Sequence, residues 1–180
     1  MKTKTTLASL AIALLFTGVS HAGPPVQYNN APASSAELFS PGFSASAFAA
    51  YLKPDGNLAE DTWGGGIGGE YFFTSMLGLA ASGTWVDPGT DEIWHNYVTD
   101  VVFRIPFESL HIAPYALAGI GVIIEDDTSI LGRAGAGIDM RFTPAFGIFS
   151  DWIYTFPSGG GRKANTEDYQ FIRIGAKINF

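Results

Sequence analysis

The chain has 180 residues, of which 47% are hydrophobic and 15% charged, and it contains no cysteine. This length suits one domain of ordinary size, and the lack of cysteine excludes disulfides and thiolate metal sites. The formal net charge of −7 argues against nucleic-acid binding, which needs a basic surface.

Residues 1–22 have the pattern of a secretory signal peptide. Two lysines begin the segment, residues 7–19 form an apolar run, and Ser20-His21-Ala22 is a small-x-small cleavage site. The apolar run is too short for a transmembrane helix, and no other stretch approaches the roughly 20 apolar residues that such a helix needs. We therefore predict export and a mature chain that starts at Gly23 with a net charge of −9, because the two lysines are lost.

Residues 23–42 are rich in Pro, Ala, Ser and Asn and show no periodicity, which predicts a flexible leader. Eight segments follow in which residues of two kinds alternate, the mark of strands with two different faces. We predict strands over residues 43–52, 62–73, 77–86, 93–105, 110–124, 130–142, 146–156 and 169–180. Pro114 lies inside the fifth segment and has no backbone N–H, which predicts a bulge near the start of that strand.

The last segment, YQFIRIGAKINF, has the clearest meaning. Isoleucines, Ala176 and Phe180 share one face, and Arg173, Gly175, Lys177 and Asn179 share the other. A terminal aromatic residue would be odd at the edge of a soluble sheet. The pattern fits a strand whose apolar face meets lipid, whose charged face lines a barrel, and which closes against the first strand.

This ending resembles the signal by which bacterial outer-membrane barrels are recognised for assembly, polar-x-Gly-x-x-apolar-x-aromatic. Arg173, Gly175, Ile178 and Phe180 carry the match. Residues 64–85, and Pro114-Tyr115 followed by Ala118-Gly119-Ile120-Gly121, resemble the small outer-membrane β-barrel family, which includes the transmembrane domain of outer-membrane protein A and the opacity proteins.

The resemblance implies an all-β fold: an eight-stranded antiparallel up-and-down transmembrane β-barrel over residues 43–180, with no stable helix. It also implies a monomer in the outer membrane of a Gram-negative bacterium. The expected partners are outer-membrane lipids and, during biogenesis, the assembly machinery and periplasmic chaperones.

Two regularities favour the barrel. The connections 53–61, 87–92, 125–129 and 157–168 are generally longer than the turns between them and carry most of the excess acid, as extracellular loops do. Outward aromatic residues also fall into two girdles, where rings prefer to lie at membrane interfaces. The expected outer girdle is Tyr51, Trp63, Trp85, Tyr97, Tyr154 and Phe156, and the inner one is Phe43, Tyr71, Phe73, Phe103, Phe142, Phe146 and Phe180.

Charged residues also occupy the alternate strand positions that are expected to face the barrel interior. Four are acids and five are bases: Glu70, Asp100, Asp139 and Asp151, with Arg104, Arg133, Arg141, Arg173 and Lys177. Unpaired charges are costly in a narrow lumen, and eight strands leave an interior filled by side chains, so we predict a salt-bridge network that plugs it. The alternative is a small porin with a gated ion path, in which glycines 64, 66, 68, 119, 121, 135 and 137 leave wet cavities beside the charges.

We favour a structural or surface-interaction role and expect no enzyme, cofactor or metal. Some eight-stranded barrels remodel lipid A, and the deacylase type uses a His-x-Ser pair, but Asn96-Tyr97 follows His95 and Ile112-Ala113 follows His111. The acidic loops lack EF-hand spacing. A soluble lipocalin-like binder, also eight-stranded, would carry its apolar face inside and its charges outside.

Overall fold

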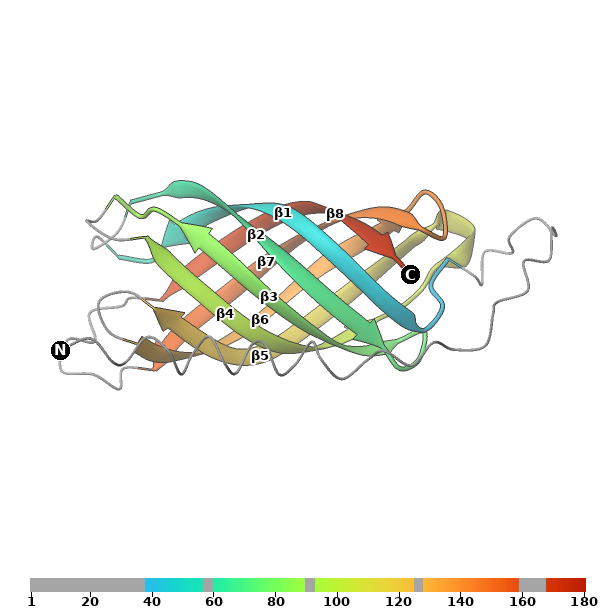
Figure 1. Ribbon diagram of the computed structural model, residues 1–180, viewed down its shortest axis with the longest axis horizontal. Helices are drawn as coiled ribbons and strands as arrows, with labels where there is room; N and C mark the ends of the chain where they lie inside the picture. Colours follow the sequence, from blue (N-terminus) through green and yellow to red (C-terminus); the bar gives the residue numbers. More distant parts are fainter. Residues whose placement is uncertain (1–37, 57–59, 90–92, 125–127, 159–167) are drawn as a thin grey trace. The chain divides into compact units, whose positions relative to one another are not determined.

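Strands with alternating faces form a closed antiparallel barrel in the computed structural model, which describes residues 38–56, 60–89, 93–124, 128–158 and 168–180. Each strand pairs with its neighbours in sequence, and β8 closes on β1 (Figure 1). The strands are β1 (Gly42–Pro54), β2 (Thr62–Phe72), β3 (Leu77–Val86), β4 (Trp94–Arg104), β5 (Ile112–Ile124), β6 (Thr128–Arg141), β7 (Phe146–Ser158) and β8 (Tyr169–Asn179). The predicted eight-stranded barrel is confirmed, with strand ends at most two residues from those expected.

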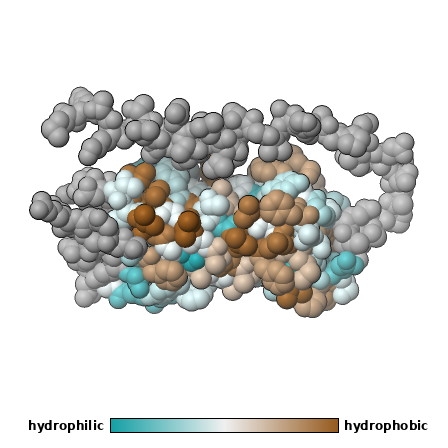
Figure 2. Space-filling view, turned by 90° about the horizontal axis from the view of Figure 1, so that it is seen from below, coloured by the Kyte–Doolittle hydropathy of each residue, from teal (hydrophilic) through white to brown (hydrophobic). Residues whose placement is uncertain are grey.

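The faces of the sheet are apolar outside and charged inside. In β1 to β4 the even-numbered side chains face the lumen, and in β5 to β8 the odd-numbered ones do. Large hydrophobic side chains such as Ile120, which is 72% exposed, stand on the outer surface, and hydrophobic residues cover much of the face seen in Figure 2. This is the reverse of the arrangement expected for a lipocalin.

The outward aromatic side chains form two bands. At one end Tyr51 packs on Trp63, with 5.2 Å between ring centroids, and at the other Phe43 stacks on Phe180 at 5.9 Å. Phe43 and Tyr51 are eight residues apart on β1, which is about 20 Å along the barrel axis at about 3.3 Å per residue and a tilt of about 40°. This separation is close to the height of the apolar band of outer-membrane barrels.

The two ends of the barrel differ in their connections. We call the end that carries connections 55–61, 87–93, 125–127 and 159–168 the loop end, and the end that carries 73–76, 105–111 and 142–145 the turn end. The expected difference in length fails at β5, because the ladder to β6 continues to Ile124↔Thr128 and leaves three connecting residues there. The β4–β5 connection has seven, among them a 3-10 turn, η2 (Glu108–Leu110), where no stable helix was expected.

Within the described residues no helix has the length and apolar character needed to cross a membrane.

Pro114 does not produce the predicted bulge. β5 pairs with β6 without a break over all 13 of its residues. On the other side, Pro114 lies beyond the end of β4, where its carbonyl accepts a hydrogen bond from the backbone N–H of Ile105 at 2.9 Å. A proline at the end of a ladder costs one donor at most, so the strand keeps its register.

The expectation of a flexible leader over 23–42 is wrong for its last residues. Leu38 and Phe39 are buried against Ala113 at the turn end, and Gly42 begins β1 with a φ of 150°, a conformation that favours glycine. An apolar pair that can be buried outweighs the polar composition around it. The predicted signal peptide, residues 23–37, and the acidic residues at 91–92 and 125–127 lie outside the described residues.

Candidate functional site in the lumen

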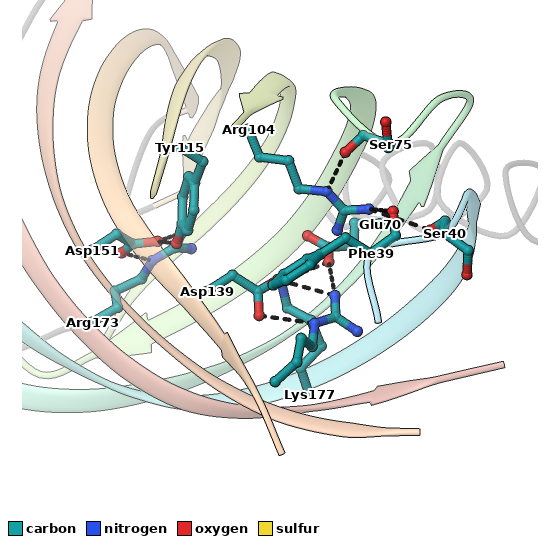
Figure 3. A network of polar contacts seen from close by, with 11 residues as sticks. Phe39, Ser40, Glu70, Ser75, Arg104, Tyr115, Asp139, Asp151, Arg173 and Lys177 are labelled. Carbon is teal, nitrogen blue, oxygen red and sulfur yellow. Dashed lines mark hydrogen bonds and ion pairs between the residues drawn. The ribbon is translucent and has the colours of Figure 1, made fainter. Parts of the chain in front are cut away.

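The structure places all nine predicted lumen charges on the inner face of the barrel. All but Glu70 are buried, and Glu70 is nearly so. They fall into two isolated ion pairs and one larger group at the turn end. Figure 3 shows part of this arrangement, with Asp151 and Arg173 separate from the group around Asp139.

The first pair joins β6 to β4. Arg133 donates to both carboxylate oxygens of Asp100, at 2.8 and 2.5 Å, and to the Ser82 hydroxyl at 3.0 Å. Gly119 of β5 lies between the two residues in the sheet register. A Cβ on Gly119 would lie 2.2 Å from an Asp100 oxygen, so the pair can form only because this position has no side chain.

The second pair joins β8 to β7. Arg173 donates to both oxygens of Asp151, at 2.8 and 2.7 Å, and the Tyr115 hydroxyl donates to the same carboxylate at 2.6 Å. The guanidinium also lies 4.8 Å from the centre of the Phe48 ring. Tyr115 reaches its partner across Gly137, as Arg133 does across Gly119. Sequence reasoning missed Tyr115, although its place two residues before inward Leu117 would have shown its orientation.

The third group holds charges from three strands around Asp139. Arg141 donates to both oxygens of Asp139 at 3.0 Å, and Lys177 donates to one of them at 3.0 Å. The Lys177 ammonium also lies 2.6 Å from Glu70 Oε1, whereas Arg141 is 4.0 Å away from the same oxygen. Both carboxylates are therefore occupied by cations.

Arg104 differs from the other cations because its partners are backbone carbonyls. It donates to the carbonyl of Ser75 at 2.7 Å, and to those of Phe39 and Ser40 at 2.9 and 3.3 Å. Its guanidinium also stacks 3.6 Å from the centre of the Phe72 ring. Figure 3 shows Phe39, Ser40 and Ser75 around this side chain.

Space in the charged part of the lumen is small. A cavity of about 50 Å³ lies among Ser46, Glu70, Asp100, Tyr115 and Lys177, enough for a few water molecules bonded to these polar groups. Of the seven inward glycines expected to leave wet cavities, Gly68 lines this space and the other six do not. There a larger neighbour, such as Ile153 beside Gly135, fills the room.

An apolar layer lies in the lumen near the loop end, and sequence reasoning did not identify it. Its side chains are almost completely buried: Leu52, Val86, Trp94, Ile123, Leu131, Ile153, Tyr169 and Phe171. The Tyr169 hydroxyl donates to Asn96 Oδ1 and so joins β8 to β4. The signal available in the sequence was a set of apolar residues at inward-facing positions near the loop ends of the strands. Charged residues also occupy inward-facing positions, and the prediction rested on these charges alone.

Gly137→Ala tests the requirement for glycine between paired side chains. A Cβ there would lie 2.5 Å from the Asp151 Cβ and 2.7 Å from the Tyr115 ring, so we expect the free energy of unfolding to fall by about 1–3 kcal/mol. Gly65→Ala is the control, because its outward Cβ would meet no atom closer than 3.3 Å. Urea midpoints measured in lipid vesicles compare the two, and an equal loss in both would refute the steric explanation.

The predicted assembly residues lie along β8. Arg173 and Gly175 face the lumen, Ile178 faces outward, and Phe180 follows the strand at the turn end. The Phe180 N–H donates to the Phe43 carbonyl at 2.9 Å, so the last residue extends the closure between β8 and β1.

Deleting Phe180 should lower the yield of folded protein in the membrane and leave export unchanged. The deletion removes the ring stacked on Phe43 and one closing hydrogen bond, whereas the predicted export information lies in residues 1–22. Membrane fractionation and heat-dependent gel mobility measure the two steps separately. Phe180→Tyr, which keeps the ring, is the control, and a full yield after deletion would contradict the prediction.

The described residues hold no cluster of metal-binding side chains. No three His, Cys, Asp or Glu side chains converge there in a way that could hold a metal ion. His95 faces outward beside Tyr97, and His111 lies at the turn end after η2.

At the loop end, hydrogen bonds from the Tyr154 hydroxyl and the Gln170 amide hold the pKa of Asp55 below its usual range, which keeps this carboxylate ionised.

Comparison with known proteins supports the fold. No protein-family model and no curated protein sequence matches the chain. Among solved structures it resembles Neisserial surface protein A (NspA), with 18% identity and a TM-score of 0.66 over 77% of this chain and 97% of that one. The N-terminal β-barrel domain of Pseudomonas aeruginosa OprF has 19% identity and a TM-score of 0.55 over 76% of this chain and 97% of that domain.

The outer membrane enzyme PagL is also similar, with 18% identity and a TM-score of 0.51 over 76% of this chain and 99% of the enzyme. At these identities the likeness concerns the backbone alone. The chain has the fold of small eight-stranded outer-membrane β-barrels.

Proposed function

We propose that this protein is an integral barrel of the bacterial outer membrane with a structural or surface-interaction role, and that its lumen is sealed. The observation that carries the proposal is the inverted distribution of polarity. Nine charged side chains stand inside the barrel, and the outer face between the two aromatic bands is apolar. Exposure of such an apolar surface to water is unfavourable, whereas contact with lipid chains is not. The closed sheet also leaves no strand edge with unpaired backbone groups.

The sealed lumen is supported by its contents. Each carboxylate of the network has a cation within 3 Å, the cavity among them measures only about 50 Å³, and the apolar layer lies between it and the loop end. An ion crossing the barrel would have to break ion pairs and displace packed side chains. A gated porin is the rival, and it requires both of these barriers to move.

A catalytic role has less support. PagL, with a similar fold, is an enzyme by its name, but a hydrolase needs a nucleophile beside a positioned base. His95 and His111 are the histidines that the structure describes, and the residues that follow them, Asn96-Tyr97 and Ile112-Ala113, do not supply the serine of a His-x-Ser pair. Surface interaction would fall to the loop end, where exposed Asp55 and Glu60 are available to a partner.

Planar-bilayer recording tests the proposal directly. Purified protein that shows heat-dependent mobility, and is thus folded, should insert and produce no steady conductance. Reproducible single-channel steps would overturn the sealed lumen and favour the porin. Recovery of the exported protein from the soluble periplasm would overturn the membrane assignment itself.

A further inference from the structure

We propose that the turn end of the barrel contains a docking site for a short peptide segment, and that residues 38–40 of the same chain occupy it as a stopper over the charged lumen. The inference deepens the proposed function, since it rests on a sealed lumen and identifies what seals one end. Nothing in the strand pattern requires these residues, because they precede β1.

The site recognises backbone through Arg104. With five cations and four carboxylates in the lumen, and with Asp139 and Glu70 occupied by Arg141 and Lys177, Arg104 has no acid within ion-pair distance among the described residues. Its guanidinium instead takes the carbonyls of Phe39 and Ser40, together with the Ser75 carbonyl from the β2–β3 turn. A planar fork of donors suits several carbonyls at once.

The site also has a place for one aromatic ring. Phe39 is 2% exposed, and its ring centre lies 5.4 Å from the guanidinium carbon of Arg104 and 5.6 Å from that of Arg141. Leu38 packs beside it against Ala113. The ring faces two cations, which favours an aromatic residue over an aliphatic one of similar size.

The stopper stands between water and the charged lumen. A cavity of about 30 Å³ next to it is lined by Leu38, Ser44, Arg104, Arg141 and Asn179, among others. The apolar layer already closes the loop end, so residues 38–40 complete the enclosure at the turn end. Gly42, the first residue of β1, has a φ of 150° and gives the backbone near the stopper a conformation that other residues resist.

Thiol accessibility tests the docking. The chain has no cysteine, so Ser44→Cys places a single thiol on the inner face under the stopper, at a residue that is 4% exposed. The full chain carrying this substitution is refolded in lipid vesicles, and its alkylation by iodoacetamide is followed by mass spectrometry. Heat-dependent mobility verifies that each variant has folded.

Adding Phe39→Ala should raise the alkylation rate about tenfold or more, because the ring and the backbone contacts it supports are lost. Leu38→Ala should raise the rate less. Deletion of residues 1–40 is a second route that leaves all eight strands intact, and it should raise the rate at least as much as Phe39→Ala. Leu110→Ala is the control, because Leu110 lies exposed at the same end outside the lumen and should have no effect.

An unchanged rate in both Phe39→Ala and the deletion would overturn the docking site. This failure is distinguishable from failure of the proposed function, because the bilayer recording of the unaltered protein answers that question independently. A conducting unaltered protein would refute the sealed lumen, whereas a silent protein with an equally protected thiol in every variant would refute only the stopper.

Discussion

Replacing Arg133 by methionine is expected to lower the free energy of unfolding by about 3–5 kcal/mol, because it leaves Asp100 buried without its cation. Arg133 supplies both hydrogen bonds of the bidentate pair and a third to Ser82. Methionine keeps most of the volume, so the loss comes from the stranded carboxylate rather than from a cavity. The measurement is the urea midpoint and slope in lipid vesicles, followed by tryptophan fluorescence.

Two further variants define the cause. Asp100→Leu combined with Arg133→Met removes both charges and should recover much of the stability, since a buried pair can often be replaced by apolar residues at little cost. Lys53→Met, on the exposed loop end of β1, should change stability by less than about 0.5 kcal/mol. If the double variant were less stable than Arg133→Met alone, the stranded charge would not be the reason.

Ile174→Lys is expected to cost about 2–4 kcal/mol in lipid, because its side chain faces outward near the middle of the apolar band. In the sheet register Ile174 lies beside Ala49 and Ser150, away from both aromatic bands. Folding in vesicles and comparing denaturant midpoints with the unaltered protein gives the value.

Ile178→Lys on the same face is the matched control. Ile174 is 57% exposed and Ile178 is 53% exposed, so the two substitutions would be equivalent if the outer face met water. Ile178 lies next to Phe146 in register, at the turn-end band, and should cost only about 0–1 kcal/mol there. Equal costs at the two depths would contradict a lipid-facing surface.

The sequence predicts the strands and their faces well because alternation with period two is a local property. Ile174 and Lys177 are assigned to opposite faces by counting alone, and the barrel follows when every strand obeys the same rule. Counting does not report distance between strands. Alternation alone places Lys177 in the lumen and predicts that loss of its charge has a small effect on stability. In the structure its ammonium is buried and contacts both Asp139 and Glu70, so removal of this charge should lower the stability considerably.

Two other features were beyond sequence reasoning for physical reasons. Whether Gly119 or Gly137 leaves a void depends on which side chains flank it on neighbouring strands, and that is fixed by register rather than by composition. The contacts of Arg104 with backbone carbonyls leave no trace in the sequence, because every residue has a carbonyl. From the sequence alone, Phe39 is therefore assigned to the polar leader.

The glycine spacers also bear on the order of assembly. Because Arg133 meets Asp100 across Gly119, this contact ties β6 to β4 and can form only after β5 has joined both. The contact between Lys177 of β8 and Glu70 of β2 spans β1, so it waits for the cylinder to close. A half-built sheet would hold these charges unpartnered. We therefore expect closure of the barrel to be cooperative, because the last strand completes ion pairs whose other members already lie on earlier strands.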